Sequence, residues 1–172
     1  MEEQSSGFGK TLALIIVALV IAVSVNKYVI QSKVVMSGSM EPTLHVGERI
    51  LINRLAYQSQ SPARGDVIEF VVPSGQDFMK RVIGVAGDTV EVRQGMVYIN
   101  DQPTSEPYVT IPANYAYGPV TVPEGDLFVL GDNRNESDDS HSWGFLETKK
   151  VEGKVIAVYM PISSARLVKV NN

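Results

Sequence analysis

The stretch FMKRVIG, residues 78–84, decides the fold class and contains the most informative charged side chain of the chain. Its β-branched and aromatic residues favour a β-strand. Side chains of a strand alternate between two faces, so Phe78, Lys80 and Val82 are expected on the same face. Lys80 would then share an apolar surface, where burial disfavours the ammonium form and lowers its pKa.

Similar short runs lie on both sides of this stretch and are separated by Gly, Pro, Asn and Asp. The turn 93–95 (Arg-Gln-Gly) between two of them is typical of a hairpin, because glycine accepts positive φ. Beyond Lys33 no segment keeps a 3.6-residue period over ten residues, so we predict a mainly β domain of antiparallel sheet. The proline-rich stretch 102–123 is expected to be a long excursion between strands. The predicted strands are Arg49–Asn53, Asp66–Val72, Phe78–Val85, Thr89–Val92, Met96–Asn100, Leu127–Leu130, Lys154–Tyr159 and Arg166–Val170.

A different composition precedes this domain. Residues 12–25 read LALIIVALVIAVSV without a charge; Asn26 and Lys27 follow, and residues 28–30 (Tyr-Val-Ile) extend the segment. About twenty such residues span the hydrocarbon core of a bilayer, so we predict a single transmembrane anchor over residues 11–30. Residues 1–10 would lie before the membrane, and residues 34–172 would form the β-rich domain beyond it. The alternatives are a cleaved signal peptide, with 22–24 (Ala-Val-Ser) as its cleavage site, and a buried core helix.

Composition excludes several classes of function. The 172-residue chain has no cysteine, which excludes disulfides, a thiol nucleophile and cysteine-ligated metals. It has two histidines, too few for a histidine-rich metal centre. Residues 34–172 hold 12 Lys and Arg against 17 Asp and Glu, with no basic run. Nucleic acid is therefore not expected as a partner.

Ser39 is the first candidate for a nucleophile. It lies in the segment MSGSMEPT, residues 36–43, directly after the predicted anchor. Gly38 is expected to let another backbone approach, and Pro42 restricts the local path. A serine exposed on such a tight loop offers a reachable Oγ beside backbone N–H groups that can hold an oxyanion. The alternative is an ordinary Ser-Gly loop.

A serine nucleophile needs a base, for which His45, His141 and Lys80 are candidates. At an ordinary pKa of about 10.4, only about 0.04% of lysine is neutral at pH 7. Lowering that pKa by about 3 units makes Lys80 a usable base and costs about 4 kcal/mol of stability. A paired or snorkelling lysine is the alternative. The long separation of Ser39 and Lys80 requires the fold to bring them together, unlike the helical S-x-x-K arrangement.

A third polar cluster, GDNRNESDDSH at residues 131–141, follows the predicted strand Leu127–Leu130. A solvated loop and a calcium-binding loop are its simpler interpretations. The oxygen spacing misses the calcium pattern D-x-[DN]-x-[DN]-G, which disfavours the second.

Together these segments resemble bacterial type I signal peptidases, the membrane-bound Ser/Lys enzymes that remove signal peptides from exported proteins. The resemblance covers essentially the whole chain and rests on four boxes in the expected order. They are SMEPT (39–43), RGDVI (64–68), KRVIG (80–84) with GD (87–88), and GDNR (131–134) with Ser137, Asp139 and Ser140.

The resemblance implies a role for each matching residue. Ser39 would be the nucleophile and Lys80 the base that takes its proton. Ser37 would form the oxyanion hole together with the backbone N–H of Ser39. Ser137 would orient the lysine amine, and Asp139 would brace the catalytic region.

Two positions depart from the family pattern. His141 occupies the position of an arginine that usually pairs with Asp139, so any replacement bond would be weaker and sensitive to pH. Ala86 stands where many members have proline. Neither departure affects Ser39 or Lys80.

The resemblance also implies a fold of coiled antiparallel β-sheets that binds substrate as an added strand. Shallow pockets would select Ala-like residues at −3 and −1 of the cleavage site. The resemblance implies that no metal and no cofactor is needed. The expected partners are exported preproteins with Ala-x-Ala-like sites and membrane lipid. The expected location is the cytoplasmic membrane, crossed once, with the catalytic domain on the extracytoplasmic side.

Three other functions remain open on the sequence. A membrane-tethered β-domain could bind extended peptides without catalysis. A self-cleaving Ser/Lys repressor would need a DNA-binding domain where this chain has the apolar segment. A Ser-His-Asp hydrolase would use His141 and Asp139.

Overall fold

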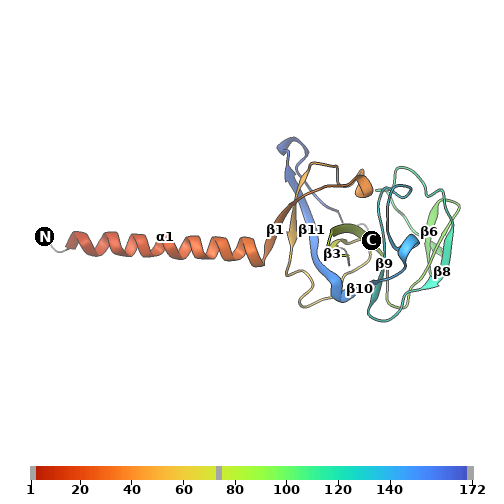
Figure 1. The fold of residues 1–172 in the computed structure, drawn as a ribbon, viewed down its shortest axis with the longest axis horizontal. Helices are drawn as coiled ribbons and strands as arrows, with labels where there is room; N and C mark the ends of the chain where they lie inside the picture. The colour runs from red at the N-terminus through yellow and green to blue at the C-terminus, as the bar shows by residue number, and fades with distance from the viewer. Residues whose placement is uncertain (1–2, 73–74, 170–172) are drawn as a thin grey trace.

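The computed structural model describes residues 3–72 and 75–169. Its first element, helix α1 (Glu3–Tyr28), extends away from a body of β-strands (Figure 1). Large apolar side chains along its middle, such as Leu14 and Val20, are exposed. Within the described ranges, no helix has both the length and the apolar character to cross a membrane. The helix ends at Tyr28, so Ile30 is not part of it and instead begins strand β1 (Ile30–Val34).

The larger sheet contains eight strands of the described chain in the order β1-β2-β11-β3-β4-β9-β10, with β12 added to β11. All of its neighbouring strands are antiparallel, as the sequence predicts. Besides β1 its members are β2 (Arg49–Asn53), β3 (Val67–Val71), β4 (Asp77–Val85), β9 (Asp126–Leu130), β10 (Leu146–Glu147), β11 (Val151–Met160) and β12 (Arg166–Leu167).

A second sheet of four described strands has the order β7-β6-β5-β8. Its members are β5 (Thr89–Arg93), β6 (Met96–Ile99), β7 (Gln102–Pro103) and β8 (Tyr117–Thr121). Gln94 and Gly95 both have positive φ, which confirms the predicted hairpin turn between β5 and β6. The expectation of one long excursion over residues 102–123 is wrong, because β7 and β8 lie within it.

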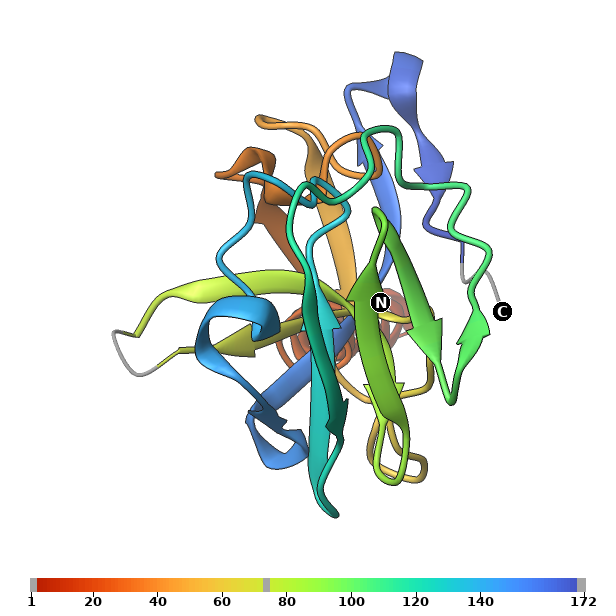
Figure 2. The same cartoon turned by 90° about the vertical axis from the view of Figure 1, so that its right-hand side faces the viewer.

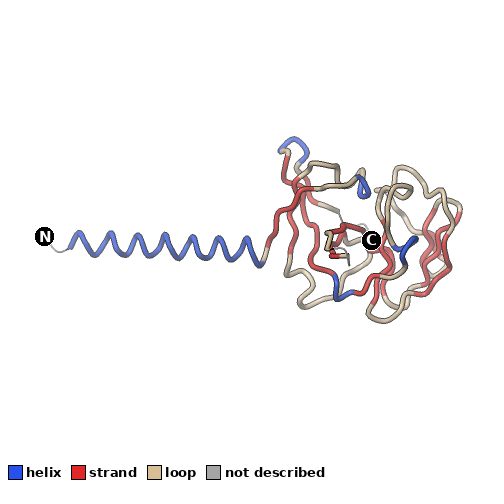
Figure 3. The backbone as a smooth tube through the Cα atoms, viewed as in Figure 1, coloured by secondary structure: helices blue, strands red, loops and turns tan. Residues whose placement is uncertain are grey.

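Helices are short beyond β1 in the described part of the chain, and strands and loops make up most of the body (Figure 3). They are η1 (Gly38–Met40), α2 (Ser140–Trp143), η2 (Thr148–Lys150) and η3 (Ile162–Ser164). The mainly β fold predicted from the sequence is therefore confirmed.

Strand β4 is central to the body because both of its faces are buried. Val82 packs with Ile68 and Phe70 of β3, whereas Met79 packs against a cluster that contains Val35 and Met40. Only the second half of β4 is paired on both sides: β9 pairs from Arg81 onward. Residues 77–80 pair with β3 on one side, and no described strand pairs with their other edge.

Candidate active site

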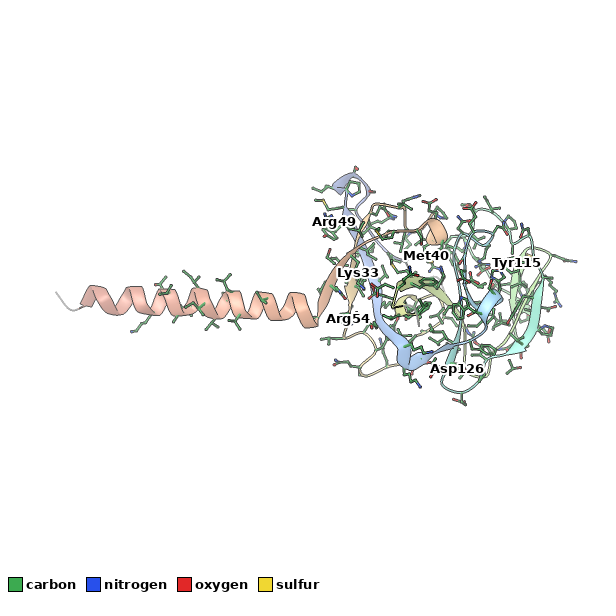
Figure 4. The ribbon with its side chains drawn as sticks, viewed as in Figure 1. Lys33, Met40, Arg49, Arg54, Tyr115 and Asp126 are labelled. Carbon is green, nitrogen blue, oxygen red and sulfur yellow. The ribbon has the colours of Figure 1, made fainter. Side chains whose placement is uncertain are left out.

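Ser39 is carried by η1, a single 3₁₀ turn that follows β1. Met40, the next residue, is buried with Val35 and Leu44 and fixes this turn to the body (Figure 4). Ser39 itself is 8% exposed. The expectation of an exposed loop is therefore wrong: the serine is almost covered and is held by its packed neighbour.

Glycine does permit a close backbone approach at Ser39, but at a different position from the predicted one. A Cβ added to Gly38 would only touch the Glu41 carboxyl group, at 3.5 Å. A Cβ on Gly131 would lie 2.4 Å from the carbonyl oxygen of Ser39 and closer still to Ser137 Oγ. Gly131 thus allows the polar loop after β9 to pack directly against the serine.

Lys80 meets Ser39 although 41 residues separate them. Its Nζ lies 2.8 Å from Ser39 Oγ and donates a hydrogen bond to it. The lysine is 3% exposed, and its Nζ lies 5.3 Å from the centre of the Phe78 ring on the same face of β4. Among the described residues no carboxylate forms an ion pair with Lys80, so this buried amine has the serine hydroxyl as its polar partner.

Burial lowers the pKa of Lys80 from 10.5 to about 8. The negative charges of Asp139, Asp138 and Asp132 oppose this effect only in part. Burial dominates because an ammonium group loses its hydration in an apolar surrounding. At pH 7 to 8 a substantial fraction of Lys80 is therefore neutral and able to accept a proton.

The two supporting serines occupy different surroundings. Ser37 Oγ lies 3.4 Å from Ser39 Oγ. Ser137 is buried against Gly131, and its Oγ has no hydrogen-bond partner in the described part of the chain. The structure therefore places Ser137 beside the Ser39 backbone, without a bond to Lys80. An orphaned buried hydroxyl carries an energetic cost, which a partner at the site would relieve.

Asp139 is fully buried and holds two elements together. Its carboxylate accepts hydrogen bonds from the backbone N–H of Gly131 and from the His141 ring, at 2.9 and 2.7 Å. The other ring nitrogen of His141 lies 3.2 Å from Ser142 Oγ, and the ring stacks on Tyr115 at 4.2 Å. Neither His141 nor the exposed His45 hydrogen-bonds Ser39 in the described structure, so both lie outside the Ser39–Lys80 contact.

A buried ion pair lies on the opposite face of β4, and sequence reasoning did not single it out. Arg81 donates to both carboxylate oxygens of Asp132, at 2.8 and 2.6 Å, and its guanidinium stacks on Tyr108. Asp132 also accepts from Thr43, four residues after the nucleophile. The sequence signal that could have indicated this pair is that Arg81 lies in the KRVIG box and Asp132 in the GDNR box.

Asn133 provides a further connection that the sequence did not predict. Its backbone N–H donates to the Ser39 carbonyl at 3.1 Å, and its side-chain amide donates to the Gly38 carbonyl at 3.2 Å. These bonds fix the turn that carries Ser39 to the loop after β9.

A cleft of about 660 Å³ opens beside Ser39 and Lys80. One side is formed by β1 and the following residues, including Val34 and Met36, and the other by residues 75–80. The unpaired edge of β4 therefore borders the cleft. No cluster of three metal-ligating side chains is present within the described ranges.

Comparison with known families supplies the decisive observation. The family model described as "Signal peptidase, peptidase S26" matches residues 8–160. The chain belongs to this family. As a member of peptidase family S26, it is a serine endopeptidase.

Individual relatives agree with this assignment over most of their length. "Probable signal peptidase I-1" of Synechocystis sp. is 40% identical over 163 residues, which are 90% of this chain and 83% of the relative. "Signal peptidase I" of Bacillus licheniformis is 35% identical over 88% of each chain. A crystal structure of a signal peptidase I from Enterococcus faecalis V583 is 40% identical, covers 55% of this chain and 97% of its own, and has a TM-score of 0.49.

Proposed function

We propose that this peptidase removes signal peptides from exported preproteins with a Ser39–Lys80 dyad. The observation that supports it most strongly is the 2.8 Å contact between Lys80 Nζ and Ser39 Oγ inside the body, where no described carboxylate forms an ion pair with the lysine. Such an amine is neutral near its pKa of about 8 and can accept the serine proton.

The reaction proceeds in two balanced steps. Ser39 Oγ attacks the carbonyl carbon of the scissile bond while its proton passes to Lys80 Nζ. Ser37 Oγ and the Ser39 backbone N–H hold the oxyanion, the carbon–nitrogen bond breaks, and Lys80 protonates the leaving amine. Lys80 then takes a proton from water, whose oxygen attacks the ester carbonyl. The bond between this carbon and Ser39 Oγ breaks, Lys80 returns the proton to Ser39 Oγ, and the signal peptide leaves with a free carboxyl group. Ser137 has no bond to Lys80 in the described structure, and we assign its unpaired buried Oγ to orienting the lysine when substrate is bound. Asp139 supports this loop through Gly131.

The substrate binds as an extended strand along the free edge of β4, residues 77–80, which offers unused backbone donors and acceptors to the cleft. Its residues at −1 and −3 point toward Met79, which packs against the cluster containing Val35 and Met40. Small side chains such as alanine leave room for the backbone to reach this edge.

The apolar helix α1 anchors the enzyme in the cytoplasmic membrane, crossed once, with the β-rich domain on the extracytoplasmic side. The support is the charge-free run of residues 12–25, whose described side chains are exposed along a helix that extends from the body (Figure 1). Contact with membrane lipid covers these side chains.

The test is cleavage of a preprotein with an Ala-x-Ala site by the full chain in detergent. We expect the native enzyme to cut after the second alanine and both Ser39→Ala and Lys80→Ala to be inactive. Binding of the preprotein without cleavage by the native chain would instead support a tethered peptide-binding domain. Cleavage by Lys80→Ala at the native rate would refute the dyad.

A further inference from the structure

An aromatic groove lies beside the active-site cleft, on the face of β4 that carries Phe78. It has a volume of about 490 Å³, and its walls include Phe70, Phe78, Trp143 and Phe145. Phe70 lies 6.1 Å from both Phe78 and Trp143, measured between ring centres. Trp143 stays 36% exposed, so the groove presents an aromatic surface to solvent.

This aromatic groove is continuous with the cleft. Gln76, Phe78 and Asp138 line both. Strands β3 and β4 extend to one side of the body, and the segment containing α2 lies close to them (Figure 2). A peptide that enters the cleft therefore passes the groove opening without leaving the protein surface.

Strand geometry assigns one substrate residue to the groove. Successive side chains of an extended peptide point to opposite faces, as they do in β4 itself. If −1 and −3 point to the Met79 side, then −2 points to the Phe78 side. This assignment rests on the function proposed above.

We propose that the aromatic groove is a subsite for an apolar side chain at position −2, the middle residue of the Ala-x-Ala site. The rings offer a large apolar contact area to leucine, isoleucine or phenylalanine. A charged side chain would lose hydration against these rings. The charged residues that line the groove are Asp138 and Lys150, and Lys150 is already paired to Glu147. The subsite therefore selects the side chain at −2, which the small pockets for −1 and −3 do not contact.

A ratio of rates tests this assignment. The full chain in detergent is given two preproteins that differ only in Leu or Gly at −2. We expect kcat/KM to be about tenfold higher for Leu, the scale of one apolar contact in a partly open site. Trp143→Ala should reduce this ratio to about 2 or less, and Trp143→Phe should retain most of it. Ile162→Ala, which truncates an exposed apolar residue outside the groove, should leave the ratio unchanged.

Fluorescence provides a second readout that does not require turnover. Trp143 is the single tryptophan of the chain, so its emission reports on the groove directly. In the full-length Ser39→Ala variant, a signal-peptide fragment with Leu at −2 should move the emission to shorter wavelength, and the matched Gly fragment should not. Vesicles of phosphatidylethanolamine and phosphatidylglycerol without peptide provide the comparison with lipid.

The outcomes separate this proposal from the proposed function. If neither preprotein is cleaved, both the proposed function and the proposed subsite are refuted. Cleavage at equal rates, with no peptide-dependent change in Trp143 emission, would overturn the subsite alone. An emission change caused by vesicles, with no dependence on −2, would assign the groove to lipid and also overturn the subsite.

Discussion

Lys80 and Arg81 are consecutive residues of β4, and both are buried cations, yet their surroundings differ completely. Arg81 donates two hydrogen bonds to Asp132 and one to the backbone carbonyl of Gly65, and its guanidinium stacks on the ring of Tyr108. Lys80 has the Ser39 hydroxyl and the nearby ring of Phe78. The alternation of the strand sends the two side chains to opposite faces.

The difference shows how one strand supports both structure and chemistry. A buried cation with a bidentate carboxylate stays charged and connects two segments. A buried amine without such a carboxylate loses its proton more readily, which is what a general base requires. The Arg81 face is therefore expected to control stability, and the Lys80 face to control activity at some cost in stability.

The largest expected effect is on catalysis. Ser39→Ala and Lys80→Ala should each lower kcat by about 10³-fold or more, because each removes a group that acts in the bond-breaking step. Preprotein cleavage in detergent measures this loss. The double variant should be no worse than either single variant, since the two residues act as one unit. Additive losses would contradict a dyad.

The next effect is on stability. Arg81→Met leaves Asp132 buried and unpaired, and we expect it to lower the free energy of unfolding by about 3–5 kcal/mol. Thermal unfolding of the full chain in detergent measures this change. Adding Asp132→Asn to the variant should restore part of the loss, because the orphaned charge is then removed. A change below about 1 kcal/mol for Arg81→Met would contradict the assigned structural role.

Lys80→Met should change stability in the opposite direction. The pKa of Lys80 is about 8 in the folded chain, below the 10.5 of the unfolded chain, so folding disfavours the proton. Below pH 8 the buried ammonium group therefore lowers the free energy of unfolding by its full amount. Between pH 8 and 10.5 the free energy of unfolding rises with pH. Removing the amine should gain about 3 kcal/mol at pH 7, from the 2.5-unit pKa difference, and nothing above pH 10.5. A gain that does not depend on pH would show that charge is not its cause.

The smallest expected effect is at His141. Its ring supports Asp139 from one side, while Gly131 binds the same carboxylate from another. His141→Ala should therefore lower kcat about tenfold or less, and His141→Arg should restore activity by renewing the bond to Asp139. A loss as large as that of Lys80→Ala would instead favour a histidine-based mechanism.

Local patterns in the sequence predicted most of the larger sheet. The predicted strand Arg49–Asn53 has the bounds of β2, and Phe78–Val85 differs from β4 by one residue. Strands β1 and β8 were missed for identifiable reasons. The predicted anchor extends past Lys27 to Ile30, the first residue of β1, and the polar residues that follow in β1 hide its strand character. Strand β8 contains Gly118 and Pro119, which disfavour a strand locally. Residue 170, the end of one predicted strand, lies outside the described residues.

The parts of the site that the sequence did not predict are contacts between segments far apart in the chain. Ser39 and Lys80 could be named from their boxes, and the fold brings them together. The close approach at Gly131, the bonds from Asn133 and the aromatic groove around Trp143 depend on segments about 60 to 95 residues apart. A single sequence carries no local signal for such contacts.

The pH dependence of kcat/KM tests most directly whether Lys80 is the base. The base must be neutral to accept the serine proton, so the rate should rise with pH to a plateau, with an apparent pKa of about 8 for the free enzyme. Below that value it should fall tenfold for each pH unit, and His141→Ala should keep the same midpoint. A midpoint near 6.5 that disappears in His141→Ala would contradict the account, because histidine would then be the titrating base.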